Sequence, residues 1–167
     1  MVTTTRRIEE KGQRTPRSKD TYAGERVGHG GSCYCDCGAV FENKRWHYAG
    51  KEASVRGGQR LVCPACRRTA ERNPAGIVSL SGGFLTVHLP EIDRLLRKMA
   101  DEALTKNPLN RVMEIRHNGL DGITVTTTQV KLAQKIGREV FKSFGGELQY
   151  HWSRGEELVR VQWFRQP

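Results

Sequence analysis

The chain has 167 residues, enough for one compact domain of ordinary size or two small ones, and 37 % of them are hydrophobic. Its 28 Lys and Arg residues exceed its 18 Asp and Glu residues, so the formal net charge is +10 and a polyanionic partner is favoured. No run of about 18 apolar residues occurs, which excludes a membrane-spanning helix, and the polar first residues lack the apolar segment of a signal peptide, so we expect a cytoplasmic protein.

Residues 1–31 are predicted to form a flexible basic arm. They hold only six apolar side chains but seven of the 28 basic residues. With so few apolar groups, burial cannot offset the entropy lost on ordering the segment. We therefore expect the arm to attract nucleic acid without forming a folded unit.

Residues 32–72 are predicted to form a zinc ribbon. An odd number of cysteines in a chain without a signal peptide argues against disulfides, whereas two groups of reduced thiols suit a metal. His47 lies between the two groups and is an alternative ligand. The five cysteines are Cys33, Cys35, Cys37, Cys63 and Cys66.

The spacing of the cysteines predicts three of the four zinc ligands. Cys63 and Cys66 are separated by two residues, which lets both thiolates turn onto one metal ion. Cys37 precedes a glycine that permits the turn after a metal-binding knuckle. Cys35 or Cys33 supplies the fourth ligand, and the sequence leaves this choice open. Four thiolates fill the zinc tetrahedron, so we expect a structural Zn²⁺ ion, with the fifth cysteine as a redox-responsive thiol in an alternative interpretation.

Residues 73–167 are predicted to form an α+β domain. The segments 76–81 and 84–88 are rich in β-branched and aromatic residues, which favours extended structure. Pro90 suits the first turn of a helix, and the apolar spacing continues from there until Asn107 and Pro108 end the helix.

The second half of this domain is predicted to contain two strands, a helix and two further strands. Thr126 and Gln129 form a capping-box pattern that predicts the start of the helix, and Gly145 predicts its end. The resulting order is a ferredoxin-like split βαβ unit with an added edge strand and both helices on one face. The predicted bounds of these elements are 111–117, 123–125, 126–144, 148–152 and 158–164.

The second predicted helix carries one basic and one apolar face. Ala133, Ile136 and Val140 follow helical spacing and are predicted to face the core. The opposite face would bind the phosphates of nucleic acid, or it is an ordinary solvated surface. Its four basic residues, at positions i, i+4, i+7 and i+11, are Lys131, Lys135, Arg138 and Lys142.

The predicted ribbon adds further candidates for nucleic-acid contacts. Cations interleaved with aromatic rings can hold phosphates and stack bases. In the alternative interpretation, the aromatic residue Trp46 covers the small core of the ribbon. The candidates are Arg45, Trp46, Arg60, Arg67, Arg68 and Arg72.

No group of residues predicts catalysis. The five histidines are scattered along the chain, and His88 beside Glu91 is more typical of packing than of an acid–base pair. No Ser-His-Asp order or phosphate-binding lysine motif occurs. We therefore expect a non-enzymatic protein with no small-molecule substrate and no membrane partner.

Several motifs resemble a known family. They are Cys37-Gly38-Ala39-Val40-Phe41, Arg45-Trp46, Cys63-Pro64-Ala65-Cys66-Arg67-Arg68, Pro74-Ala75-Gly76, Leu80-Ser81-Gly82-Gly83-Phe84, Ile123-Thr124-Val125-Thr126-Thr127 and Arg160-Val161-Gln162-Trp163. Over about residues 20–167 the chain is similar to a family of small uncharacterised bacterial zinc-ribbon proteins. That family in turn resembles the zinc-bearing core of the archaeal and eukaryotic adaptor for nuclear export of the large ribosomal subunit. The chain departs from the family at its first knuckle, where Cys-x-Cys-x-Cys replaces Cys-x-x-Cys.

The resemblance implies binding to the ribosome or to ribosomal RNA without catalysis, which agrees with the positive charge. We therefore expect a ribosome- or translation-associated zinc protein. The alternative is a protein-interaction adaptor with a structural zinc and a redox-responsive cysteine.

Overall fold

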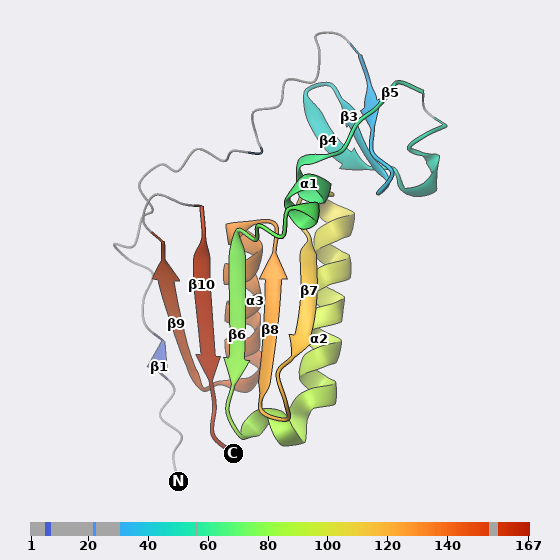
Figure 1. Cartoon of the computed structure of the whole chain (residues 1–167). Helices are drawn as coiled ribbons and strands as arrows, with labels where there is room; N and C mark the ends of the chain where they lie inside the picture. The colour runs from blue at the N-terminus through green and yellow to red at the C-terminus, as the bar shows by residue number, and fades with distance from the viewer. Residues whose placement is uncertain (1–5, 8–21, 23–30, 56, 154–156) are drawn as a thin grey trace.

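The computed structural model describes residues 6–7, 22, 31–55, 57–153 and 157–167, which include three α-helices and two mixed β-sheets. The smaller sheet and a short helix form one unit, and the larger sheet with two long helices forms the other (Figure 1). The predicted α+β class is confirmed.

The cysteine unit is built on a four-stranded sheet in the order β4-β3-β2-β5. The hairpin between β3 and β4 turns at Asn43 and Lys44, which both have positive φ angles, as a two-residue hairpin loop requires. A 3₁₀-helix, Gly50–Glu52, and α1, Pro64–Ala70, complete the unit. The strands are β2, Cys33–Tyr34; β3, Ala39–Glu42; β4, Arg45–Tyr48; and β5, Gln59–Arg60.

The sheet unit contains a six-stranded sheet in the order β1-β9-β10-β6-β8-β7. The pairs β1–β9 and β10–β6 are parallel, and the other neighbours are antiparallel. Helices α2, Phe84–Lys106, and α3, Val130–Phe144, cover the same face of this sheet (Figure 1). The strands are β1, Arg6–Arg7; β6, Gly76–Ser81; β7, Val112–His117; β8, Gly122–Thr127; β9, Glu147–Trp152; and β10, Val159–Phe164.

The added strand of the sheet lies inside it, which corrects the prediction of an added edge strand. β10 pairs with β9 on one side and with β6 on the other. Its residues Val159, Val161 and Trp163 are fully buried, so a central position removes the most apolar surface from water. The strand order therefore differs from that of a simple ferredoxin-like unit.

Helix α2 begins earlier than the sequence predicts. Residues 84–88, expected to be extended, form its first turns, and a kink at His88 precedes the segment with Pro90. Phe84 is buried there and packs against Trp163, with ring centroids 6.2 Å apart. The helix is favoured because it brings this aromatic side chain onto the core, and tertiary packing overrides a weak β-propensity.

Helix α3 begins later than the capping pattern predicts. Thr126 is part of β8 and pairs with Ile77, and the helix starts at Val130 after Gln129. Continuing the sheet ladder satisfies the backbone of Thr126 without a helix cap. The predicted ends of both long helices agree with the structure, since α2 stops before Asn107 and α3 before Gly145.

The predicted arm lies mostly outside the described residues. Within it, Arg6–Arg7 pairs with Glu147 and Leu148 of β9. Tyr22 is buried, and its hydroxyl donates a hydrogen bond to Glu71. These two contacts between the N-terminal region and the folded units were not predicted.

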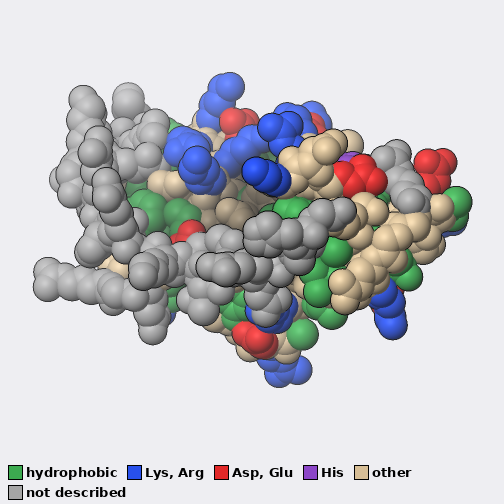
Figure 2. All heavy atoms as spheres, turned by 90° about the horizontal axis from the view of Figure 1, so that it is seen from above, with side chains coloured by type: hydrophobic (Ala, Val, Ile, Leu, Met, Phe, Trp, Pro, Cys, Tyr) green, Lys and Arg blue, Asp and Glu red, His purple; other side chains and the backbone are tan. Residues whose placement is uncertain are grey.

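The main core lies between the six-stranded sheet and its two helices. The sheet contributes residues such as Val78, Val125 and Leu148, and the helices contribute residues such as Leu96 and Ile136, all fully buried. Seen from above, the Lys and Arg side chains are unevenly distributed, and many of them lie along the upper edge of Figure 2.

A close approach of α3 to the sheet provides a test of this packing. A Cβ atom at Gly137 would lie 2.5 Å from Val161 Cγ1 and 3.1 Å from Leu148 Cδ1. We expect Gly137→Val to lower the free energy of unfolding by about 1–3 kcal/mol, measured by chemical denaturation, because the helix must move off the sheet. Ser143→Val, on the exposed side of the same helix, is the control and should change it by no more than about 0.5 kcal/mol. Equal losses in the two variants would contradict this account.

Candidate metal centre

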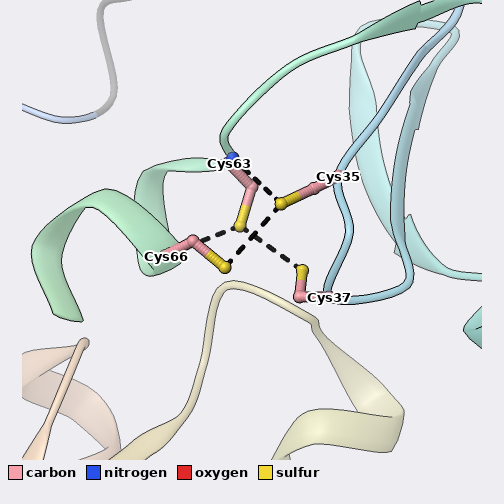
Figure 3. Close-up of side chains that lie close together, drawn as sticks. All are labelled: Cys35, Cys37, Cys63 and Cys66. Atoms are coloured by element: carbon pink, nitrogen blue, oxygen red, sulfur yellow. Dashed lines mark hydrogen bonds between the residues drawn. The ribbon is translucent and has the colours of Figure 1, made fainter. Parts of the chain in front are cut away.

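Four cysteine thiols meet at the junction of the two units (Figure 3). The Sγ atoms of Cys35, Cys37, Cys63 and Cys66 all lie within 4.8 Å of one another. The Cys35–Cys66 and Cys37–Cys63 sulfur pairs are each 3.7 Å apart. A tetrahedron with zinc–sulfur bonds of about 2.3 Å has edges of about 3.8 Å. The sulfur positions therefore fit one tetrahedral metal ion.

The first two cysteines of the group, Cys35 and Cys37, lie in the tight turn between β2 and β3. The Cys35 N–H donates to the Ala39 carbonyl at 2.8 Å, and the Gly38 N–H donates to the Cys35 carbonyl at 3.0 Å. Gly38 has φ +93°, and a Cβ atom there would lie 2.9 Å from the Gly50 Cα. Only glycine fits this turn, which explains why Gly38 follows Cys37.

The other two cysteines of the group, Cys63 and Cys66, lie at the start of α1. Cys63 is the N-cap residue, and its sulfur accepts a hydrogen bond from the Cys66 N–H at 3.4 Å. Pro64 occupies the first turn, where no backbone N–H is needed. The Cys63 N–H donates to the Cys35 sulfur at 3.4 Å, which joins the two pairs. The helix start thus places both sulfurs of the Cys-x-x-Cys motif on one side.

The structure selects Cys35 over Cys33 for the fourth position. Cys33 lies in β2 opposite Phe41, is buried, and is not part of the group. His47 also lies outside the group and instead contacts Glu42 at 3.5 Å. The alternative left open by the sequence is therefore decided by the path of the chain after β2.

Arg111 contacts three of the four sulfurs and was not predicted. Its Nη2 donates to the sulfurs of Cys63 at 3.0 Å and Cys37 at 3.2 Å. Its Nη1 donates to the Cys66 sulfur at 3.4 Å. No local pattern could reveal this contact, because Arg111 is 45 to 74 residues away from these cysteines in sequence.

Hydrogen bonds within the group favour the ionised form of Cys66 and the protonated form of Cys63. Hydrogen bonds with Cys37 and Cys63, aided by Arg111, lower the pKa of Cys66 to about 3. Hydrogen bonds with Cys37 and Cys66, together with burial, raise the pKa of Cys63. Burial lowers the pKa of Arg111, but the charges of Cys63 and the other sulfurs outweigh it and raise this pKa overall. A cation thus lies against thiols that must lose their protons to bind a metal.

The predicted nucleic-acid contacts on the cysteine unit are dispersed. Arg45 and Arg72 are exposed. Arg60 is exposed and forms an ion pair with Asp36. Trp46 is half-buried, packs against Phe41 with ring centroids 5.3 Å apart, and covers the small core, as the alternative interpretation held.

The two arginines of α1 contact Tyr22. The Arg67 guanidinium is half-buried and lies 5.9 Å from the centre of the Tyr22 ring. Arg68 is only 6 % exposed and lies 4.3 Å from the same ring. Arg68 also donates to the Asn73 carbonyl at 3.1 Å and contacts Glu157 at 3.5 Å. Arg68 is therefore a structural residue, which corrects its predicted place on a nucleic-acid surface.

The basic face of α3 has the predicted geometry. Lys131, Lys135 and Lys142 are exposed and Arg138 is half-buried. The opposite side of the helix is buried through residues such as Ile136. The positive charges therefore point away from the core, as a phosphate-binding surface requires.

Comparisons with known protein families, curated proteins and solved structures found no match to this chain. Its predicted family resemblance thus remains a hypothesis. Among the described residues, every helix is too short or too polar to cross a lipid bilayer.

Proposed function

We propose that this protein is a non-enzymatic zinc protein that binds ribosomal RNA or the ribosome in the cytoplasm. The observation that carries the proposal is the combination of a four-cysteine group with a helix that turns four basic residues away from its buried side. The four cysteines would hold Zn²⁺ as a structural ion, and the basic face of α3 would contact phosphates.

The ligand set supports a structural role for the metal. Cys35, Cys37, Cys63 and Cys66 supply all four positions of a zinc tetrahedron. A catalytic zinc keeps one position for water or substrate, whereas these four sulfurs leave none. Thiolates are also the ligands that select zinc over harder divalent cations such as Mg²⁺.

Two described histidines pair with carboxylates near the protein surface. His88 contacts Glu91 at 2.6 Å on the exposed side of α2. His117 contacts Asp93 at 3.4 Å, and both side chains are partly exposed. Asp93 also lines an open depression on the surface of α2.

The basic face of α3 supports a nucleic-acid partner. From Lys131 to Lys142 it extends over eleven residue steps, or about 16.5 Å at about 1.5 Å per step, a length that matches several successive phosphates. Neutralising phosphates releases counterions, so such a surface binds nucleic acid in a salt-dependent way. The net charge of +10 adds long-range attraction.

Co-sedimentation of the tagged, zinc-loaded protein with purified ribosomal subunits tests the proposal. We expect association at about 50 mM salt that falls steeply towards about 200 mM, because several phosphate contacts release counterions. RNase treatment of the subunits should release the protein. Binding that is insensitive to salt and RNase would contradict the proposal and favour the protein-adaptor alternative.

A further inference from the structure

The guanidinium of Arg111 reaches from the sheet unit into the metal centre of the cysteine unit. Arg111 belongs to the loop between α2 and β7, whereas all four cysteines belong to the other unit. Its contacts with three sulfurs are therefore contacts between the two units. We propose that Arg111 is a positioning residue that couples metal binding to the docking of the cysteine unit on the sheet unit.

The loop holds Arg111 in a fixed position. The Arg111 Nε donates to the Pro108 carbonyl at 2.6 Å. The Arg111 backbone N–H donates to the Thr128 hydroxyl at 2.8 Å, and the Thr128 N–H donates to the Arg111 carbonyl at 2.9 Å. The Thr128 hydroxyl in turn donates to the Leu109 carbonyl at 2.6 Å. The guanidinium is thus held in place by its own loop and by the segment before α3, which reduces the entropy that it loses on contacting the sulfurs.

The charge of the centre explains why a cation is needed there. Four thiolates and one Zn²⁺ ion carry a formal charge of 2−, and half-buried Arg111 offsets one of these charges. Arginine presents its N–H donors in a planar fork, so one side chain can donate to three sulfurs at once. Such partners of the ligands typically change metal affinity by about 10–100-fold when they are removed.

Other contacts also join the two units, such as the ion pair between Arg68 of α1 and Glu157 at 3.5 Å, and the loop between α2 and β7 adds an apolar one. Leu109 packs against the small core formed by Cys35, Ala39, Cys63 and Ala65. The main core of the sheet unit is a separate cluster. The loop between α2 and β7 therefore contacts both the sulfurs and the small core. Loss of the metal is expected to change the structure of this loop.

This inference rests on the proposed metal centre, and its test uses the full chain with Zn²⁺ as the probe. Arg111→Gln removes the charge and the fork, and Arg111→Lys restores the charge alone. Arg116→Gln is the matched control, because it makes the same change at an exposed arginine of β7 that contacts Glu114. Zinc affinity is measured by competition with a chelator of known affinity. Hydrogen exchange of residues 107–111 is compared with and without zinc.

We expect Arg111→Gln to lower zinc affinity by about 10–100-fold, Arg111→Lys to lower it less, and Arg116→Gln to leave it within twofold. Zinc should protect residues 107–111 from exchange in the wild type and in Arg116→Gln but not in Arg111→Gln. If Arg111 had only a structural role, Arg111→Gln would lower the free energy of unfolding equally with and without zinc. The zinc-dependent protection of residues 107–111 would then be unchanged.

Three results would overturn the inference, and each has a different meaning. Wild-type affinity and protection in Arg111→Gln would show that the arginine is not coupled to the metal, while leaving the metal centre intact. If Arg111→Gln does not fold, Arg111→Lys is the test. Wild-type zinc affinity and protection in Arg111→Lys would show that the planar guanidinium is not coupled to the metal. A wild-type protein that binds no zinc would overturn both the inference and the proposed centre.

Discussion

Replacing Cys66 with Ser is expected to abolish metal binding and unfold the cysteine unit while the sheet unit stays folded. The largest buried cluster of the cysteine unit consists of four small residues, Cys35, Ala39, Cys63 and Ala65, and the unit's other buried apolar residues are Cys33, Val40 and Ala53 among those described. So little apolar burial cannot offset the entropy of ordering the unit. Structural zinc sites supply an apparent binding free energy of about 10–16 kcal/mol, which is folding free energy for units of this kind.

The experiment combines elemental analysis of the purified protein with backbone NMR spectra. We expect one zinc per wild-type chain, none in Cys66→Ser, and loss of dispersed signals for the cysteine unit only. The sheet unit should persist because its core is a separate and much larger cluster.

Cys33→Ser is the matched control for this change. Cys33 is as buried as Cys35, at 4 % exposure, but its sulfur lies outside the group of four. It should keep one zinc and a folded cysteine unit, with only a modest loss of stability. A zinc-free Cys66→Ser protein with a folded cysteine unit would show that the metal is not what holds this unit together.

Changing Lys131, Lys135, Arg138 and Lys142 together to Gln is expected to remove most of the association with RNA while the protein melts almost as before. The substitutions at exposed Lys131, Lys135 and Lys142 should each change the free energy of unfolding by no more than about 0.5 kcal/mol, and half-buried Arg138 should add only a modest loss, because the buried side of α3 is untouched. Four lost phosphate contacts should make the slope of log affinity against log salt shallower by about three, at ~0.7–0.9 per contact.

The control removes the same number of charges from the other long helix. Arg94, Arg97, Lys98 and Lys106 are exposed on α2, where Arg97 contacts Asp93 at 2.7 Å and Lys98 contacts Glu102 at 3.9 Å. Acidic neighbours weaken the field of this surface, so the corresponding four-Gln variant should change the salt slope much less. Equal changes in both variants would mean that only net charge matters, and an unchanged slope in the α3 variant would show that its basic face is a solvated surface.

Much of the local structure of this protein follows from short-range patterns in its sequence. The helix ends near Asn107 and Gly145 were predicted because the Asn-Pro pair and the Gly-Gly pair stand where the apolar helical spacing stops. The apolar spacing around Ile136 placed the basic face of α3 correctly, because a regular helix repeats every 3.6 residues. The separation of Cys63 and Cys66 alone predicted that their sulfurs would lie together, and the structure places them in one group.

Other features were decided only by the tertiary structure. Cys35 rather than Cys33 joins the group of thiols because the turn after β2 carries it towards α1. Arg68 is buried because Tyr22, which is far away in the sequence, lies against it. Arg111 reaches the sulfurs because the loop between α2 and β7 lies beneath the cysteine unit. Each of these contacts joins segments that share no local periodicity, so spacing along the chain predicts helices and ligand pairs, whereas the packing of distant segments determines which charged and sulfur side chains meet.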